Sequence, residues 1–192
     1  QAAAAGSAGS ACSEGKGPVK ALLDREMLSE ISRVTLGDYA QSAEGFWEGT
    51  RDHDVSQNVN ALVDNLAGEP PFRILALGCG PGRDLMTFKT MGHSPVGLDG
   101  TLEFCTMARN YAGCEVLHQD FLNLNLPESE FHGVFANATL FHVPSQELGR
   151  VLSELNASLK PEGVLFSSNP RGRNVEGWNG TRYGAYHDLE GW

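Results

Sequence analysis

Three glycines and one aspartate form the pattern in this chain that points most directly to chemistry. Gly78, Gly80 and Gly82 follow an apolar run at residues 72–77, and Asp99 lies 21 residues after the first glycine. Glycines allow the backbone to turn sharply and to approach a ligand closely, because they have no Cβ. A carboxylate about 20 residues beyond such a turn is placed to bind a ribose hydroxyl in nucleotide-binding folds. The spacing therefore predicts a ribose-containing ligand at this turn.

The surrounding residues predict the elements that would position this pattern. The run at residues 72–77 has the length and the Ile/Leu content of a buried strand. A helical repeat follows, with Leu85, Phe88 and Met91 at near three-residue spacing. A second short strand, at residues 95–98, then leads into the aspartate. Strand, glycine turn, helix, strand and acid form the first half of a nucleotide-binding unit.

The glycine spacing separates this turn from the dinucleotide fingerprint. A GxGxxG pattern would place its third glycine at position 83, where the chain has Arg83. Residues 74–82, ILALGCGPG, instead resemble the first motif of the class I S-adenosylmethionine-dependent methyltransferases, particularly the small-molecule group. The resemblance implies S-adenosylmethionine as the cofactor and methyl transfer to a small-molecule nucleophile as the activity.

The resemblance also implies which residues bind the cofactor. Asp99 would bind the ribose, Asp120 and Phe121 would hold the adenine, and the Asn137 region would contact the methionine part. Ala76 stands where the family often has an acid, and Asp84 could supply that missing charge. The full set of cofactor candidates is Gly78, Cys79, Gly80, Gly82, Asp84, Asp99, Gly100, Asp120, Phe121 and Asn137.

Helices and strands alternate through the rest of the chain. Helical patterns at residues 101–112 and 148–159 lie between apolar strands at residues 114–118, 131–136 and 164–166. This alternation predicts a Rossmann-like, doubly wound α/β fold with a mainly parallel sheet of order 3-2-1-4-5. The family normally adds a sixth and a seventh strand, for which this chain provides no sequence. The domain, residues 18–192, is therefore expected to be incomplete at its C-terminus, and a partner chain could cover the open edge of the fifth strand.

The N-terminal part divides into a tail and a helical segment. Residues 1–17 are rich in Ala, Gly and Ser, which predicts a flexible tail. Residues 18–53 predict a helix that ends at Gly37 and a second, aromatic segment that is helical in part. The resemblance implies that this region is a lid over the cofactor, with Tyr39 and Trp47 as substrate candidates. The alternative is that these rings only cover the edge of the sheet. Asp54 is the expected N-cap of the next helix.

The resemblance points to His142 as the candidate catalytic residue. It follows the predicted fourth strand, whose end lies over the transferable methyl group in the family. A single histidine can equally be a packed or a solvent-facing residue. Beyond residue 169 the chain is rich in Gly and aromatic residues, which predicts either a loop that closes over the substrate or an exposed, partly disordered loop. Arg171, Tyr183 and His187 are its substrate candidates. Arg171, Arg173 and Arg182 could hold a carboxylate or another anion, since guanidinium geometry suits such groups, so the small-molecule substrate could be anionic.

Composition restricts the partners. The formal net charge of −10 disfavours nucleic acid, whose binding needs clustered Lys and Arg. No apolar run reaches the roughly 20 residues that span a bilayer, so no membrane partner is predicted. A small-molecule substrate is favoured.

The cysteines indicate a reducing compartment. Cys12, Cys79, Cys105 and Cys114 have no metal-ligand spacing, which predicts no metal site and free thiols. That compartment would be the cytoplasm or an organelle interior. The Ala/Ser-rich start is compatible with the remnant of a transit peptide, although it lacks arginines.

Two other functions fit parts of the pattern. A methyltransferase fold without activity could act as a binding or assembly module of a larger complex, which Ala76 and the shortened sheet would explain. A nicotinamide-dependent oxidoreductase would use the same strand, turn and helix, but the glycine spacing and the lack of a substrate domain speak against it.

Overall fold

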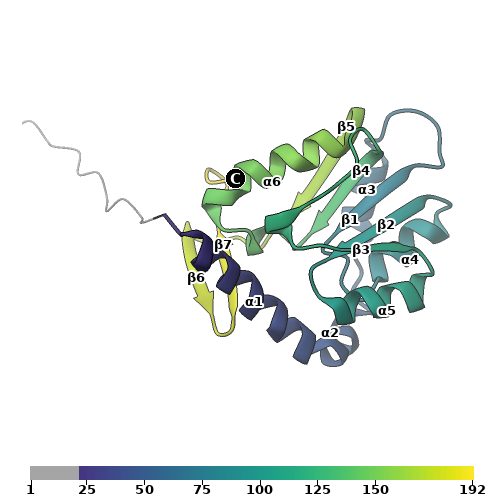
Figure 1. Cartoon of the computed structure of the whole chain (residues 1–192). Helices are drawn as coiled ribbons and strands as arrows, with labels where there is room; N and C mark the ends of the chain where they lie inside the picture. The colour runs from purple at the N-terminus through teal and green to yellow at the C-terminus, as the bar shows by residue number, and fades with distance from the viewer. Residues whose placement is uncertain (1–21) are drawn as a thin grey trace, which may run out of the picture.

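The structure, a computed structural model, describes residues 22–192, so the predicted tail at residues 1–17 lies outside the described residues. A five-stranded parallel sheet of order β3-β2-β1-β4-β5 forms the centre of the fold (Figure 1). Its strands are β1 (Arg73–Leu77), β2 (Ser94–Asp99), β3 (Glu115–His118), β4 (Phe131–Asn137) and β5 (Leu159–Ser168). Both the predicted Rossmann-like architecture and the predicted strand order are confirmed.

Helices cover both faces of the sheet. Successive side chains of a strand point to opposite faces. Accordingly, Ile74 and Ala76 of β1 pack against α3 (Ser56–Val63), α4 (Arg83–Thr90) and α5 (Leu102–Ala112). Leu75 and Leu77 pack on the other face, in the cluster that includes α6 (Ser145–Ser158). Figure 1 shows α6 on one side of the sheet and α4 and α5 on the other. Two short 3-10 helices, η1 (Phe121–Asn123) and η2 (Leu140–His142), follow β3 and β4.

The strand order creates a crevice beside β1. This strand pairs in parallel with β2 on one side and with β4 on the other. The chain therefore leaves the sheet in opposite directions from β1 and β4, and ligands bind at such switch points. Asp99 ends β2 and Asn137 ends β4, so both side chains lie at the carboxyl edge of the sheet.

The N-terminal helices differ from the prediction in their boundaries. A single helix, α1 (Arg25–Gln41), continues through Gly37, and α2 (Ala43–Thr50) follows after Ser42. A glycine inside a helix costs only about 1 kcal/mol relative to alanine. The Asp24 side chain caps α1 by accepting a hydrogen bond from the backbone of Met27, and Ile31 is buried on its inner face. These interactions outweigh the glycine, so the predicted end at Gly37 was wrong.

The interpretation of the C-terminal part as a loop was wrong for residues 175–186. They form an antiparallel hairpin of β6 (Val175–Asn179) and β7 (Arg182–Tyr186), in a separate two-stranded sheet. Gly180 adopts φ 62° in the two-residue turn, a conformation that glycine tolerates. Tyr183 and Ala185 are buried, and β7 packs on α1 and η2. Figure 1 shows α1 and this hairpin side by side at one end of the sheet.

Neither strand of the hairpin joins the main sheet. Within residues 22–192, β5 pairs only with β4, so the other edge of β5 has no strand partner there. In the same part of the chain, no helix combines the length and the hydropathy that crossing a membrane would require.

Candidate functional site

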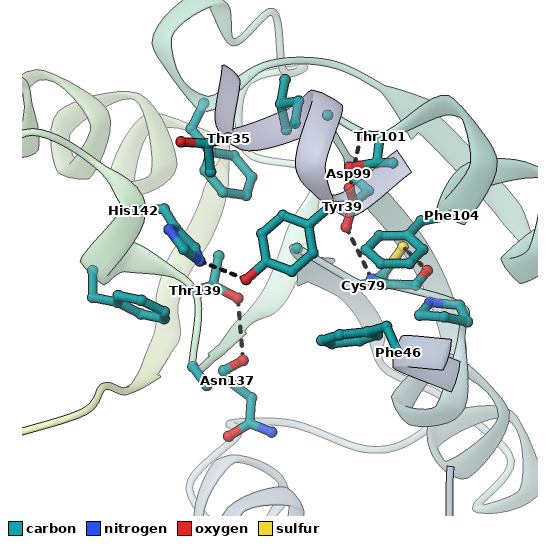
Figure 2. A pocket seen from close by; sticks show the side chains of 18 of the residues that line it. Thr35, Tyr39, Phe46, Cys79, Asp99, Thr101, Phe104, Asn137, Thr139 and His142 are labelled. Atoms are coloured by element: carbon teal, nitrogen blue, oxygen red, sulfur yellow. Dashed lines mark hydrogen bonds between the residues drawn. The ribbon is translucent and has the colours of Figure 1, made fainter. Parts of the chain in front are cut away.

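A cavity of about 520 Å³ lies at the carboxyl ends of β1, β2 and β4 (Figure 2). The glycine turn after β1 forms one wall, and side chains of α1, α2 and η2 form the opposite wall. Its volume is within the range of about 300–1,000 Å³ that is typical of small-molecule sites. The crevice that the topology creates is therefore a pocket of ligand size.

The glycine turn has a backbone that requires glycine. Gly78, Gly80 and Gly82 adopt φ angles of 64°, 51° and 101°. A Cβ on Gly78 would lie 2.6 Å from Oγ1 of Thr139, and a Cβ on Gly82 would lie 2.9 Å from Cα of Ala108. Both separations are shorter than real Cβ contacts allow. The turn thus fits against Thr139 and Ala108 only because Gly78 and Gly82 have no Cβ.

Asp99 joins the end of β2 to the glycine turn. Its Oδ2 accepts a hydrogen bond from the Gly80 backbone N–H at 2.9 Å, and its Oδ1 accepts one from Thr101 at 2.8 Å. Burial raises the pKa of this carboxyl group, and the two N–H donors act against that rise. The carboxylate is buried but lines the cavity, as Figure 2 shows.

The other predicted cofactor residues lie around the same cavity. Asp120 accepts a hydrogen bond from the Leu122 backbone, and Asn137 accepts one from Oγ of Ser168 at 2.6 Å. Nine of the ten candidates line the cavity: Gly78, Cys79, Gly80, Asp84, Asp99, Gly100, Asp120, Phe121 and Asn137. The tenth, Gly82, lies behind the wall, against Ala108.

His142 and Tyr39 form a hydrogen-bonded pair on the opposite wall. The Tyr39 hydroxyl lies 2.8 Å from Nε2 of His142, and Nδ1 of His142 lies 2.7 Å from the backbone carbonyl of Tyr183. A carbonyl can only accept, so Nδ1 carries the proton. In the neutral imidazole Nε2 then accepts the Tyr39 hydroxyl proton. Burial lowers the pKa of His142, which favours this neutral form.

Aromatic rings surround the pair. The Tyr39 ring contacts Phe46 and Phe104, each at 5.7 Å between centroids. Trp47 also lines the cavity and contacts the ring of Tyr111. Phe104 was not among the sequence candidates, because it lies on α5 within an ordinary helical repeat and no local signal marks it.

Arg182, which the sequence suggested as a possible anion-binding residue, contacts Tyr39 and Asp38 in the structure and does not line the cavity. Its guanidinium carbon lies 3.9 Å above the centroid of the Tyr39 ring. Its Nε donates to Asp38 at 2.6 Å, and the Thr181 hydroxyl and Arg182 together lower the pKa of that carboxyl group. Arg182 therefore connects the hairpin to α1 directly above Tyr39. Three arginines lie close together in this part of the sequence, and only the fold distinguishes Arg182 from the others.

The five substrate candidates fall into two groups. Tyr39 and Trp47 line the cavity, whereas Arg171, Tyr183 and His187 do not. Arg171 is exposed, Tyr183 is buried behind His142, and His187 contacts Oγ of Ser145. Residues 22–192 contain no group of three or more His, Cys, Asp or Glu side chains arranged to hold a metal ion.

The lowered pKa of His142 leads to an expected pH dependence of stability. The unfolded chain binds a proton at this histidine more readily than the folded chain, whose imidazole faces Tyr39 and the positive charge of Arg182. The free energy of unfolding should therefore fall as the pH drops through the usual histidine pKa of about 6.5 towards the lower pKa of the folded state. Urea denaturation at pH 7.5 and pH 5.5 would measure the fall.

Two variants control for the contributions of other groups. His142→Gln should reduce the pH-dependent fall, whereas His53→Gln, at an exposed position, should leave it unchanged. An equal fall in the wild type and in His142→Gln would contradict this assignment.

Comparison with known proteins supports the resemblance to methyltransferases. Residues 74–163 match a family model described as "Methyltransferase domain". Sterol 24-C-methyltransferase ERG6B of Gibberella zeae is 29% identical over 124 residues, covering 59% of this chain and 32% of that protein. The chain thus spans about a third of the length of that curated relative.

Two solved structures share the fold. Burkholderia thailandensis 1,6-didemethyltoxoflavin-N1-methyltransferase, with bound 1,6-didemethyltoxoflavin and S-adenosylhomocysteine, gives a TM-score of 0.67 at 20% identity, over 90% of this chain and 78% of that chain. The DhpI–S-adenosylhomocysteine complex gives a TM-score of 0.65 at 20% identity, over 84% of this chain and 83% of that chain. The matched family region runs from β1 into β5 and contains the glycine turn, Asp99 and Asp120. Residues 74–163 of this chain therefore match the methyltransferase domain model, and the sheet that they form shares the fold of these two solved methyltransferases.

Proposed function

We propose that this protein transfers a methyl group from S-adenosylmethionine to a small-molecule nucleophile. The observation that carries the proposal is the cavity itself, since the glycine turn, Asp99 and Asp120 lie around one pocket at the switch point of the sheet. The family match supports it independently. When bound, the cofactor supplies a methyl group that its sulfonium already activates, so the protein acts mainly by alignment.

The residues around the cavity fit the parts of this cofactor. Each carboxylate oxygen of Asp99 accepts one backbone hydrogen bond and has capacity for another, so Asp99 can still accept from a ribose hydroxyl. Asp120 and Phe121 lie side by side in sequence at the cavity wall, where a carboxylate and an apolar ring suit adenine. The turn at residues 78–80 and Asn137 remain for the methionine part.

We assign the lid to the N-terminal helices α1 and α2. They contribute Tyr39, Phe46 and Trp47 to the cavity, and Phe46 lies against Gly80 of the glycine turn. The lid excludes water from the reacting groups, and His142 is positioned on the same wall to receive a proton from the acceptor.

Calorimetric titration of the full chain with S-adenosylhomocysteine tests the cofactor. We expect binding of one equivalent, and no binding of reduced nicotinamide cofactor, whose fingerprint the glycine spacing does not match. Incubation with labelled S-adenosylmethionine and a panel of hydroxyl, amine and thiol acceptors tests the transfer. Failure of a folded sample to bind S-adenosylhomocysteine would overturn the proposal. Binding without transfer to any acceptor would favour the inactive binding module instead.

A further inference from the structure

The lining of the cavity is largely apolar. It includes the side chains of Ile31, Leu36, Phe46, Phe104 and Phe141. Among the described residues that line the cavity, Arg83 is the cationic side chain, and no lysine lines it. Arg83 already donates to Asp84 at 2.7 Å and to the Thr50 carbonyl at 3.0 Å. An anionic acceptor would therefore lose its hydration without gaining a free cationic partner.

The Tyr39 hydroxyl is the polar group that stands among these rings. Figure 2 shows the Tyr39 ring between His142 on one side and Phe104 on the other, with its hydroxyl directed at the imidazole. Because Nδ1 of His142 donates to the Tyr183 carbonyl, Nε2 is fixed as the acceptor. Tyr39 and His142 both line the cavity, and the Tyr39 hydroxyl occupies the hydrogen-bonding position at Nε2, the one basic nitrogen of this pair.

Arg182 is placed to act on Tyr39 rather than on a ligand. It does not line the cavity, and its guanidinium lies 3.9 Å above the Tyr39 ring while Asp38 holds it in position. A cation over the ring stabilises negative charge that develops on the phenol oxygen. The Tyr39 hydroxyl thus has an acceptor for its proton on one side and a positive charge above its ring.

We infer that the methyl acceptor is an uncharged molecule with a flat, apolar body and one hydroxyl group, and that Tyr39 relays the proton of this hydroxyl to His142. In this step the acceptor O–H gives its proton to the Tyr39 oxygen, and Tyr39 gives its own proton to Nε2 of His142. The acceptor oxygen bonds the methyl carbon, and the sulfur keeps the electron pair of the bond that breaks. The positive charge moves from sulfur to imidazole, so the total charge of the cavity and its ligands stays constant. This inference rests on the proposed function.

Three naphthalene probes test the class of acceptor. The full chain, saturated with S-adenosylhomocysteine, is titrated by calorimetry with 2-naphthol, 2-naphthoate and 2-naphthylmethylamine at pH 7.5. We expect 2-naphthol to bind at least tenfold more tightly than either charged probe. Equal or tighter binding of a charged probe, or no binding of 2-naphthol, would overturn the inference. Absence of S-adenosylhomocysteine binding would instead overturn the proposed function, which separates the two failures.

Single-turnover transfer to 2-naphthol tests the relay. Tyr39→Phe should lower the rate at least a hundredfold, which is in the range for loss of general base catalysis, and should change S-adenosylhomocysteine affinity less than twofold. Tyr111→Phe, a tyrosine near the cavity but outside its wall, should keep the wild-type rate. A Tyr39→Phe rate within threefold of wild type, or no methylation of bound 2-naphthol by the wild type, would contradict the relay.

The tautomer of His142 provides a test without turnover. Nitrogen-15 spectra of the histidine side chains at pH 7 should show neutral His142 protonated at Nδ1, and Tyr39→Phe should shift the Nε2 resonance because its donor is gone. In single-turnover profiles the wild-type rate should fall at acid pH as His142 becomes protonated beside Tyr39 and Arg182, and His142→Gln should remove this dependence. A doubly protonated or Nε2-protonated His142 at pH 7 would refute the assigned direction of transfer.

Discussion

Replacement of Gly82 with alanine is expected to lower the free energy of unfolding by about 3 kcal/mol, from strain and from overpacking. The φ angle of 101° at Gly82 is unfavourable for any residue with a Cβ, and that Cβ would lie 2.9 Å from the backbone of Ala108. Backbone atoms cannot rotate away as a flexible side chain can, so α4 and α5 would have to separate. For a chain of this size the melting temperature should fall by roughly 6–12 °C, which scanning calorimetry would measure.

Gly149→Ala is the matched control. Gly149 is exposed within α6, and a Cβ there would meet nothing within 4 Å. Alanine should therefore stabilise the helix by up to about 1 kcal/mol. If both substitutions changed the melting temperature by the same amount and in the same direction, the assigned packing of the glycine turn would be incorrect.

Asp99→Asn is expected to weaken S-adenosylhomocysteine binding at least tenfold, which corresponds to about 1.4 kcal/mol. The carboxylate accepts from the Gly80 and Thr101 backbones with different oxygens. An asparagine has one oxygen, so its amide group would face one of these N–H donors and the glycine turn would shift. Because burial raises the pKa of Asp99, the folded chain gains from removing this charge, and the main loss should appear in binding rather than in stability.

Calorimetric titration of folded Asp99→Asn at pH 7.5 measures this loss. Glu103→Gln removes a carboxylate from the exposed first turn of α5 and should leave the affinity unchanged. An Asp99→Asn protein that bound S-adenosylhomocysteine as tightly as the wild type would show that the carboxylate makes no contribution to the cofactor site.

The sequence was sufficient where structure depends on neighbours along the chain. The run from β1 through the glycine turn and α4 to Asp99 has a local signal at every step, namely apolar runs, glycines and a helical repeat. The alternation of helices and strands predicted the parallel sheet, and the strand order 3-2-1-4-5 was the one expected for a doubly wound nucleotide-binding fold. That fold also predicts a ligand at the carboxyl edge of the sheet, where Asp99 and Asn137 line the cavity.

The C-terminal hairpin shows where composition misled the prediction. Residues 169–192 are rich in glycine, which favours a loop, yet Gly180-Thr181 fits a two-residue hairpin turn with glycine at its first position. The flanking Trp178 and Tyr183 are typical strand residues and pair across the hairpin. The turn signal was present in the sequence, and the glycine content obscured it.

The Tyr39–His142 pair could not be derived from local patterns. The two residues are 103 positions apart, and Arg182 is 144 positions from Asp38. No periodicity or motif in the sequence marks these two contacts, because each forms only when α1 packs beside the hairpin in the folded chain. The individual residues could be suggested as candidates, but their partners, tautomer and charge environment depend on the folded chain.

The contact between α1 and β7 also determines when the protein can finish folding during synthesis on the ribosome. Thr35 bonds to the Tyr183 backbone across 148 residues, so α1 is translated long before the segment that covers it. At roughly 5–20 residues per second, the nascent helix waits about 7–30 s with its apolar face uncovered. We therefore expect chaperones to bind the emerging chain at α1, and the aromatic half of the cavity to form last, after translation has passed the hairpin.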